Sequence, residues 1–554
     1  MKQILYIVAS AALLLSSCIK NDIPYPVVAL QVLEVQGEGF TQSDMDPKNR
    51  VVTLALDETT DIRKVQINSV KVTDVSKMTD KVATGDYVRL SQPLTGAFDM
   101  RTPIYVTLSL YQDYDWTIRA EQVIERRFAV KGQIGASEFD LTNRIVTAKV
   151  ARNIDLNHIH VTDLKLGPEG VTTTSPTLAD LADADFSEVR LVEVSYHGQT
   201  EQWRLYVVYT EELVAVSAMD LWKNTASLSI APQPAATTVV LNYKKSTETA
   251  WQATTITKNG DNTYTAAIQP VWRESTNAAG LPIYTVNTSQ GVFAGHTYDY
   301  QLLVDGALKG AGQFVTVAGD RIPDGEMEDG ALSCFTTQNE ATDRWASGNN
   351  GFTSKLCVQS TKAGMQGNHC VKLSGSKTLG ILAAGNLFSG TFVFKGMNGT
   401  ANFGQKYTYT ARPTTLKVKY HATVGLVDVQ KNDGPLAVGE QDKARIYVCI
   451  VDWSARHGVK SGTGKPEGMW DPEKESSMPG CGNVVGYGAL WIDATTAGDA
   501  MLDVEIPIHY YQKTEAAPQG NYTLIISNST SAYGDFINGC SSNVLYVDDF
   551  RWGY

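Results

Sequence analysis

The stretch Asn543-Val-Leu-Tyr-Val-Asp-Asp-Phe-Arg-Trp-Gly-Tyr554 decides how the chain is interpreted. Its apolar first half predicts a buried strand, which two carboxylates and an aromatic tail follow. We expect this strand to close a sheet and to lie beside a first strand at Glu326-Met-Glu-Asp-Gly330, where a second acidic cluster opens the same segment. If the two strands are neighbours, their acidic side chains converge.

Length and composition favour several β domains. The chain has 554 residues, and a typical domain of about 150 residues predicts roughly three to four of them. Short β-branched runs broken by Gly, Pro, Asn and Asp recur along the chain, whereas long helical periodicity is hard to find. We therefore predict an all-β protein, with tandem immunoglobulin-like sandwiches followed by a large C-terminal β-sandwich of the jelly-roll type.

The N-terminus has the pattern of a secretory signal. Residues 1–17 contain Lys2, an apolar core and a small-residue end, and this core is too short for a membrane span. Cys18 follows in a sequence that resembles the bacterial lipoprotein box, so we expect it to carry the lipid anchor, with residues 18–26 as a tether. The resemblance predicts an outer-membrane lipoprotein, on either the periplasmic or the cell-surface face.

Charge and cysteine content narrow the classes further. Removal of residues 1–17 takes away Lys2 and changes the formal net charge from −12 to −13, which gives no electrostatic route to nucleic acid. The six remaining cysteines all lie in the C-terminal segment: Cys334, Cys357, Cys370, Cys449, Cys481 and Cys540. In an exported protein an even number suggests disulfides of undetermined pairing, and buried free thiols are the alternative.

An internal repeat defines the first two modules. With an offset of 94 residues, Asn49-Arg-Val-Val-Thr53 falls on Asn143-Arg-Ile-Val-Thr147. Each copy ends with a strand led by a tryptophan, Trp116 or Trp203. We interpret residues 27–131 and 132–211 as two immunoglobulin-like domains.

A third β module and a larger segment complete the chain. Residues 212–319 resemble a fibronectin type III domain, with Asp305-Gly306 as a tight hairpin turn. Residues 320–554 concentrate the cysteines and carry tryptophans in loop-like contexts. At that length, with short strands throughout, this segment fits a jelly roll.

Ordered motifs in residues 320–554 resemble one known family. They are Glu326-Met-Glu-Asp-Gly330, Arg344-Trp-Ala-Ser-Gly-Asn-Asn-Gly351, Leu382-Ala-Ala-Gly-Asn-Leu-Phe-Ser-Gly-Thr-Phe392, Asn402-Phe-Gly404, Ala411-Arg-Pro-Thr-Thr-Leu-Lys-Val-Lys-Tyr420 and Ser542-Asn-Val-Leu-Tyr-Val-Asp-Asp-Phe550. Together they look like the "putative carbohydrate metabolism domain" of surface lipoproteins. The resemblance implies a carbohydrate-binding jelly roll on a lipid-anchored stalk. Met327 departs from the family pattern, which tends to have an aromatic residue there.

Sugar binding needs flat apolar faces and a few orienting polar groups. The candidate faces are Trp345, Trp453, Trp470 and Trp552. Arg412 in the Arg-Pro motif either holds a uronic acid or forms a structural ion pair. Each tryptophan has the alternative of packing in the core.

Glu328, Asp548 and Asp549 are the candidate metal ligands. Calcium takes six to eight oxygens, and a site that joins the first strand to the last would hold the sandwich closed. Jelly-roll carbohydrate-binding modules often carry such a structural ion, so the resemblance implies calcium at these positions. The alternative is that Asp548 and Asp549 accept hydrogen bonds from turn amides without a metal.

We predict a lipid-anchored envelope protein that binds carbohydrate without catalysis, in glycan capture or utilisation. A glycoside hydrolase is the first alternative, since it needs only a carboxylate pair, with Asp452 beside Trp453 as the first acid to consider. An adhesin or assembly protein with a cell-surface protein partner is the second. No serine-esterase, zinc-protease or phosphate-loop motif is present.

Overall fold

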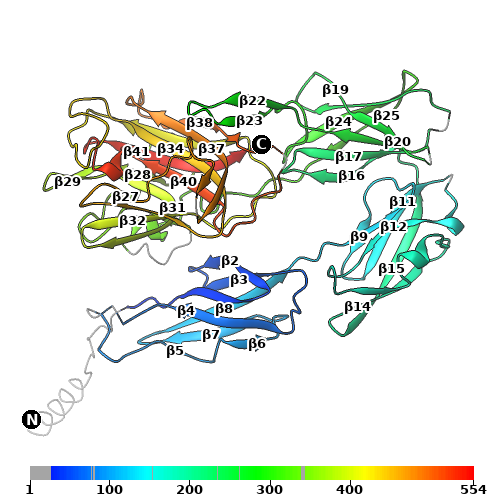
Figure 1. Ribbon diagram of the computed structural model, residues 1–554, viewed down its shortest axis with the longest axis horizontal. Helices are drawn as coiled ribbons and strands as arrows, with labels where there is room; N and C mark the ends of the chain where they lie inside the picture. Colours follow the sequence, from blue (N-terminus) through cyan, green and yellow to red (C-terminus); the bar gives the residue numbers. More distant parts are fainter. Residues whose placement is uncertain are drawn as a thin grey trace, which may run out of the picture. The chain divides into compact units, whose positions relative to one another are not determined.

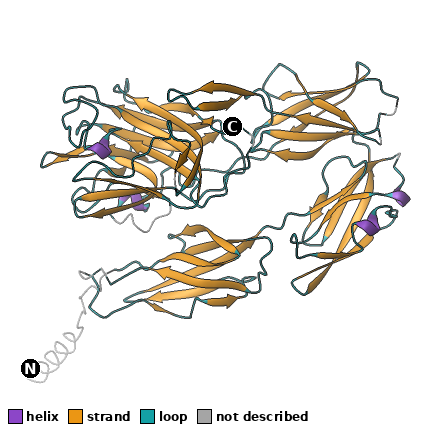
Figure 2. Cartoon of the chain, in the orientation of Figure 1, coloured by secondary structure: helices purple, strands orange, loops and turns teal. Residues whose placement is uncertain are grey.

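The computed structural model describes residues 27–554 apart from 77, 79–80, 153, 234, 261, 338–343, 479 and 514. The expected signal, Cys18 and the tether at 18–26 lie outside these residues. The described chain is all-β, with several small sheets and one large antiparallel sheet (Figure 2). Its only helical elements are four 3-10 turns: η1 (Leu156–His158), η2 (Ala179–Leu181), η3 (Ser333–Phe335) and η4 (Gly534–Phe536). None of the helices described is long and apolar enough to cross a membrane.

The chain divides into two compact units, residues 1–123 and 124–554. The described part of the first unit has a three-stranded and a five-stranded sheet, in the orders β1-β4-β6 and β2-β3-β8-β7-β5. Its strands are β1 (Val32–Glu38), β2 (Phe40–Asp46), β3 (Val51–Leu56), β4 (Val65–Val72), β5 (Arg89–Leu90), β6 (Gly96–Phe98), β7 (Ile104–Ser109) and β8 (Asp113–Gln122). Apolar residues that alternate along β3, β4 and β8 form its core, with Trp116 almost completely buried.

The second unit begins with a similar module. Its sheets have the orders β10-β11-β15-β14-β13 and β12-β9. The strands are β9 (Arg127–Val130), β10 (Glu138–Asp140), β11 (Ile145–Ala151), β12 (Val161–Lys165), β13 (Thr173–Ser175), β14 (Arg190–Tyr196) and β15 (Gln199–Thr210). The parallel pair β11·β15 repeats the parallel pair β3·β8 of the first unit, and Trp203 is buried as Trp116 is.

The repeated sequence forms the same hairpin in both modules. Asp46 accepts hydrogen bonds from the backbone and side chain of Asn49, and Asp140 does the same for Asn143. The next residues, Arg50 and Arg144, have φ of 56° and 53°. A third hairpin follows this scheme at Asp220, where Asn224 has φ of 57°. Asparagine adopts this left-handed conformation more readily than arginine does.

The third module has two four-stranded sheets, in the orders β16-β17-β21-β20 and β19-β18-β24-β25. The strands are β16 (Val214–Asp220), β17 (Thr225–Ile230), β18 (Val239–Lys245), β19 (Gln252–Ala253), β20 (Thr255–Lys258), β21 (Tyr264–Ile268), β24 (Thr297–Val304) and β25 (Ala307–Val315). Between β21 and β24 the chain forms a hairpin of β22 (Trp272–Thr276) and β23 (Pro282–Val286). This hairpin joins neither sheet of the module, because β23 pairs with β39 (His509–Tyr510) of the C-terminal segment. The two segments therefore share a sheet, although the sequence predicts a boundary between them at 319/320.

The C-terminal segment packs a large sheet on a smaller one (Figure 1). The eleven-stranded sheet has the order β22-β23-β39-β37-β34-β40-β31-β32-β35, with β26 on β31 and β36 on β37. The five-stranded sheet is β27-β28-β41-β33-β38, and β29-β30 form a hairpin. The strands are β26 (Trp345–Ala346), β27 (Cys357–Ser360), β28 (Cys370–Ser374), β29 (Ser376–Thr378), β30 (Ile381–Ala383), β31 (Asn386–Lys395), β32 (Asn398–Phe403), β33 (Thr415–Thr423), β34 (Ala444–Trp453), β35 (His457–Ser461), β36 (Ser477–Met478), β37 (Gly482–Ile492), β38 (Leu502–Pro507), β40 (Leu524–Ser529) and β41 (Val544–Gly553).

The final strand is buried as the sequence predicts, but its partners differ. β41 lies in the interior of its sheet, paired on one side with β28 and on the other with β33. Residues 326–330 form no strand, and Phe550 N donates to Gly325 O, directly before them, at 2.9 Å. The expectation that the first and last strands pair is therefore wrong, because β28 and β33 occupy both edges of β41.

Candidate functional site

The large sheet has two differently used faces. Along β34, Ala444, Ile446, Val448 and Ile450 point into the core between the sheets, since alternate residues of a strand face opposite ways. The intervening residues, from Arg445 to Trp453, point to the outer face. There Cys449, Val451 and Trp453 join a second, smaller apolar cluster.

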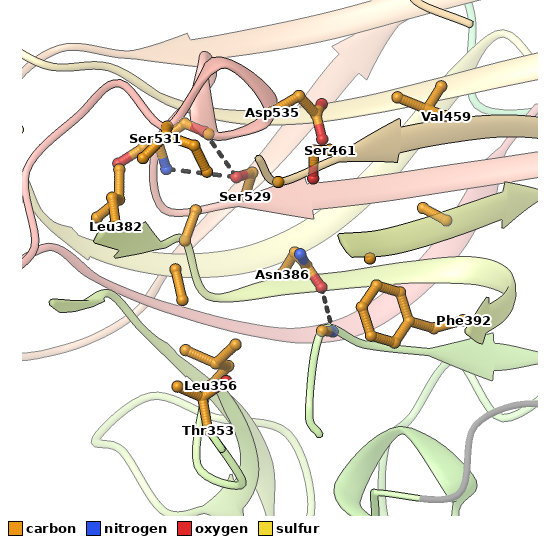
Figure 3. A pocket seen from close by; sticks show the side chains of 18 of the residues that line it. Thr353, Leu356, Leu382, Asn386, Phe392, Val459, Ser461, Ser529, Ser531 and Asp535 are labelled. Atoms are coloured by element: carbon orange, nitrogen blue, oxygen red, sulfur yellow. Dashed lines mark hydrogen bonds between the residues drawn. The ribbon is translucent and has the colours of Figure 1, made fainter. Parts of the chain in front are cut away.

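A cavity of about 440 Å³ opens on this outer face (Figure 3). It is lined by β31, β32, β34, β35 and β40, by the β29–β30 hairpin, and by the segments around residues 350 and 535. The volume falls within the range of about 300–1,000 Å³ that small-molecule sites occupy. The cavity is therefore large enough for one or a few sugar units.

One part of the lining is apolar and aromatic. Phe392 and Phe394 come from β31, and the ring of Phe352 lies 5.8 Å from that of Phe394. Trp470 is partly buried and packs against Trp453 at 5.4 Å between ring centroids. Phe352 is 74% exposed. Exposed aromatic and aliphatic groups at the mouth of a cavity are typical of binding sites.

Another part of the lining is polar. Ser529 Oγ donates to Ser531 O at 2.8 Å, and Asn386 Oδ1 accepts from Gly348 N at 2.6 Å (Figure 3). Ser527 lies two residues before Ser529 on β40, so both point to the same face. The hydroxyl and amide groups offer donors and acceptors beside the aromatic rings.

Two charged side chains line the cavity, Arg445 and Asp535. Asp535 lies within η4, in the segment beyond β40, and Figure 3 shows its carboxyl pointing in the direction of Ser461. Burial raises the pKa of Asp535 to about 6, because the carboxylate loses hydration. A carboxyl group with a raised pKa in a cavity is a candidate ligand-binding or acid group.

Three of the four predicted tryptophan platforms are core residues. Trp345 is fully buried, donates to Pro323 O at 2.9 Å and packs on Phe550. Trp453 is fully buried, and Trp552 is 8% exposed. A buried ring cannot present its face to a sugar, so the expectation is corrected for these three residues. Trp470 does line the cavity.

Arg412 is a structural residue at the junction with the third module. Its guanidinium donates to Trp222 O at 2.6 Å, Gln512 O at 3.3 Å and Lys513 O at 3.2 Å. It also stacks within 5.0 Å of the rings of Trp222, Trp272 and Tyr510. Burial lowers its pKa. Arg412 is 1% exposed and does not line the cavity, so the expectation of ligand binding by this residue is corrected.

Protein groups hold the three predicted calcium ligands. Glu328 Oε1 accepts from the backbone of Asn368 and His369 at 2.8 and 3.1 Å. Burial acts to raise the pKa of Glu328, but the hydrogen bonds from His369 and Asn368 outweigh it and hold the pKa below its usual value. Asp548 accepts from Gln366 N at 2.7 Å, and Asp549 pairs with Arg551 at 2.8 Å.

This arrangement does not fit the expected calcium site. Within the described ranges, no group of three His, Cys, Asp or Glu side chains is placed to hold a metal ion. Asp548 Oδ1 is buried without a hydrogen-bond partner among the described residues, and burial raises the pKa of Asp548 to about 6. The carboxylates of Glu328 and Asp548 accept hydrogen bonds from backbone amides, as expected for carboxylates that bind no metal.

Asp452 lies on the surface outside the cavity lining. Its carboxylate accepts from Gln519 N at 2.8 Å and Gly520 N at 2.6 Å. It therefore fixes a loop, which corrects its expected place as an acid in a cleft. All six C-terminal cysteines are free, and five of them are buried, which corrects the expectation of disulfides.

Sequence reasoning did not find Arg445 or Asp535. Arg445 interrupts the outward-facing positions of an otherwise apolar strand, which was the one available signal. Nothing local distinguishes Asp535 from the other acids of the segment. Its burial depends on strands that are distant in sequence.

Comparisons with solved structures give low similarity. A "putative glycoside hydrolase" from Bacteroides thetaiotaomicron is 15% identical, over 77% of this chain and 95% of that chain, with a TM-score of 0.27. A second "putative glycoside hydrolase", from Bacteroides vulgatus, is 19% identical over 38% of this chain and 85% of that chain, also with a TM-score of 0.27. A Bacteroides ovatus SGBP-B in complex with a mixed-linkage heptasaccharide is 8% identical over 89% of this chain and 99% of that chain, with a TM-score of 0.11. At these TM-scores the similarities say nothing about activity.

No curated protein shows significant similarity to the chain. The family comparison, in contrast, is specific to the segment that contains the cavity. It confirms the resemblance predicted from the ordered motifs. Residues 326–552 match the family model described as "Putative carbohydrate metabolism domain", so the C-terminal segment carries a domain of that family.

Proposed function

We propose that the outer-face cavity of the C-terminal segment binds a carbohydrate without cleaving it. The observation that supports this is the division of the lining into aromatic rings on one part and hydroxyl and amide groups on another. A sugar ring has the same two characters, since its C–H faces are apolar and its hydroxyl edges are polar. The match of this segment to a carbohydrate-related family agrees with the assignment.

The proposal includes the setting of the domain. A lipid anchor on Cys18 would place the protein at the outer membrane, and the immunoglobulin-like and fibronectin-like modules would space the cavity from the surface. The cavity-bearing segment, with its large sheet packed on a smaller one, would be a variant of the jelly roll. Glycan capture or utilisation is the role that suits this arrangement.

Hydrolysis by a carboxylate pair has less support. A glycosidase of the usual kind needs two carboxyl groups about 5–10 Å apart. Among the residues that line the cavity, Asp535 is the one carboxyl group. Its raised pKa would suit a general acid, but the described lining offers no second carboxylate as base or nucleophile.

A glycan array with the full-length protein tests the proposal. We expect retention of a defined glycan that is recovered intact. Phe352→Ala should weaken binding about tenfold with little loss of stability, because this exposed ring lines the cavity mouth. Trp251→Ala is the matched control, since Trp251 is 40% exposed in the third module. Shortened oligosaccharides would instead indicate hydrolysis, and silence on every glycan would favour a protein ligand.

A further inference from the structure

Arg445 has surroundings unlike those of the other charged groups in the segment. Its guanidinium stacks at 4.6 Å on Tyr447 and at 4.5 Å on Trp491, and its Nη2 donates to Tyr487 Oη at 2.5 Å. Its Nε is buried and has no hydrogen-bond partner among the described residues. No described carboxylate lies within ion-pair distance. The side chain therefore keeps its positive charge in a neutral, aromatic setting.

Other arginines of the segment use their hydrogen-bonding capacity within the protein. Arg344 and Arg551 pair with carboxylates, and Arg412 donates to three carbonyl oxygens. A buried N–H group without an acceptor is costly unless a ligand supplies one. The nearby rings of Tyr447 and Trp491 restrict the guanidinium of Arg445, which preorganises it for a planar acceptor.

The position of Arg445 connects this group to the cavity. It lies opposite Ser529 in the β34–β40 pairing, and Tyr447 lies opposite Ser527. All four side chains line the cavity. A guanidinium flanked by hydroxyl groups can bind a carboxylate through its fork while the hydroxyls contact the neighbouring sugar oxygens. The second charged group of the lining is Asp535. It would repel an anion, so the acidic group of the ligand must be held on the Arg445 side.

We infer that the carbohydrate bound in the cavity is acidic and that Arg445 binds the carboxylate of a uronic acid unit. This inference rests on the proposed function. The chain as a whole is negative at −12 and attracts no anion at long range, so the preference must come from this local contact. A carboxylate is favoured over a neutral sugar because the paired, desolvated charge is worth more than a neutral hydrogen bond.

Matched ligands that differ only in charge test the inference. The full-length protein is titrated with uronic acid oligosaccharides, with their methyl esters and with neutral oligosaccharides of equal length. We expect each acid that binds to do so at least tenfold more tightly than its methyl ester. This comparison uses the unaltered protein, so it does not depend on whether a variant folds.

Variants then assign the preference to one residue. Arg445→Gln should reduce the acid-to-ester ratio to about one, and Arg445→Lys should retain only part of it because the fork is lost. Arg456→Gln is the matched control, since Arg456 also stacks on an aromatic ring, Tyr522, but does not line the cavity. Equal affinity for acid and ester, or tighter binding of sulfated sugars, would overturn the inference and leave glycan binding intact. Binding of no glycan at all would overturn the proposed function as well.

Discussion

Asp548 lies in an environment that makes the stability of the fold depend on pH. Its ordinary pKa of 3.8 is raised to about 6 by burial, so the ionised form is disfavoured in the folded state. The unfolded chain ionises first as pH rises, and the folded state therefore loses stability between about pH 4 and 6. This destabilisation is absent below the pKa of the unfolded chain and complete above the pKa of the folded state.

Asp548→Asn should therefore stabilise the protein at pH 7.5 by about 1–3 kcal/mol and have little effect near pH 3.5. Asparagine can still accept the hydrogen bond from Gln366 N. Chemical denaturation at the two pH values measures the difference, with the exposed Asp452→Asn as control. If the variant is instead less stable at pH 7.5 and calcium addition stabilises only the unaltered protein, a calcium role for Asp548 is restored.

Asp549 differs from its neighbour because it has a cationic partner. It pairs with Arg551 at 2.8 Å and has φ of 56°. Asp549→Ala should lower the melting temperature, since it removes the pair and places alanine in a left-handed conformation, at a cost of about 1–2 kcal/mol. Glycan affinity should change little. A larger effect on affinity than on melting temperature would contradict this role.

A substitution of Arg412 tests whether this residue stabilises the fold or binds ligand. Arg412→Gln removes donors to three carbonyl groups and the contacts with three rings, so we expect a loss of about 3 kcal/mol or more in the free energy of unfolding. Calorimetry measures this loss. Binding by the fraction that remains folded should keep its affinity, because Arg412 does not line the cavity. Weakened binding without destabilisation would return Arg412 to the binding site.

At the scale of elements, the hairpin β22–β23 joins the third module to the C-terminal segment. Trp272 begins β22, lies beside Arg412 and makes an edge contact with Tyr510 of β39. Replacement of residues 272–286 by a short Gly-Ser loop should lower the melting temperature of the C-terminal segment. Hydrogen exchange should show faster exchange around β39 and unchanged exchange in β28 and β41. Uniform protection after the replacement would show that the hairpin is dispensable.

Strand identity was readable from the sequence, but strand partners were not. The alternation of apolar residues locates β41, β8 and β15, although β8 and β15 begin at Asp113 and Gln199, before the tryptophans predicted to lead them. The pairing of β41 with β28 and β33 depends on contacts across more than a hundred residues, and local pattern contains no information about such partners. The same limit explains why Trp345 and Trp453, in apparent loops, proved to be core residues.

At the scale of the whole molecule, the first unit has its own core. Its buried residues form one cluster between Val28 and Ile118, and the chain divides after Val123. Removal of residues 27–123 should leave the melting transition and the glycan affinity of the remaining chain unchanged, as measured by calorimetry and titration. Removal of residues 27–319 should destabilise what remains, because it takes away Trp222 and the β22–β23 hairpin. Equal behaviour of the two truncations would contradict this division.

The place of β41 in its sheet has a consequence for synthesis. β28 and β33 do not pair with each other, because β41 lies between them. Neither can pair with β41 until that strand is made, about 170 residues after β28 ends. At roughly 5–20 residues per second, the wait is on the order of ten seconds or more. The first unit is complete in the growing chain before that interval begins, whereas the smaller sheet of the C-terminal segment stays open until residues 544–553 are available.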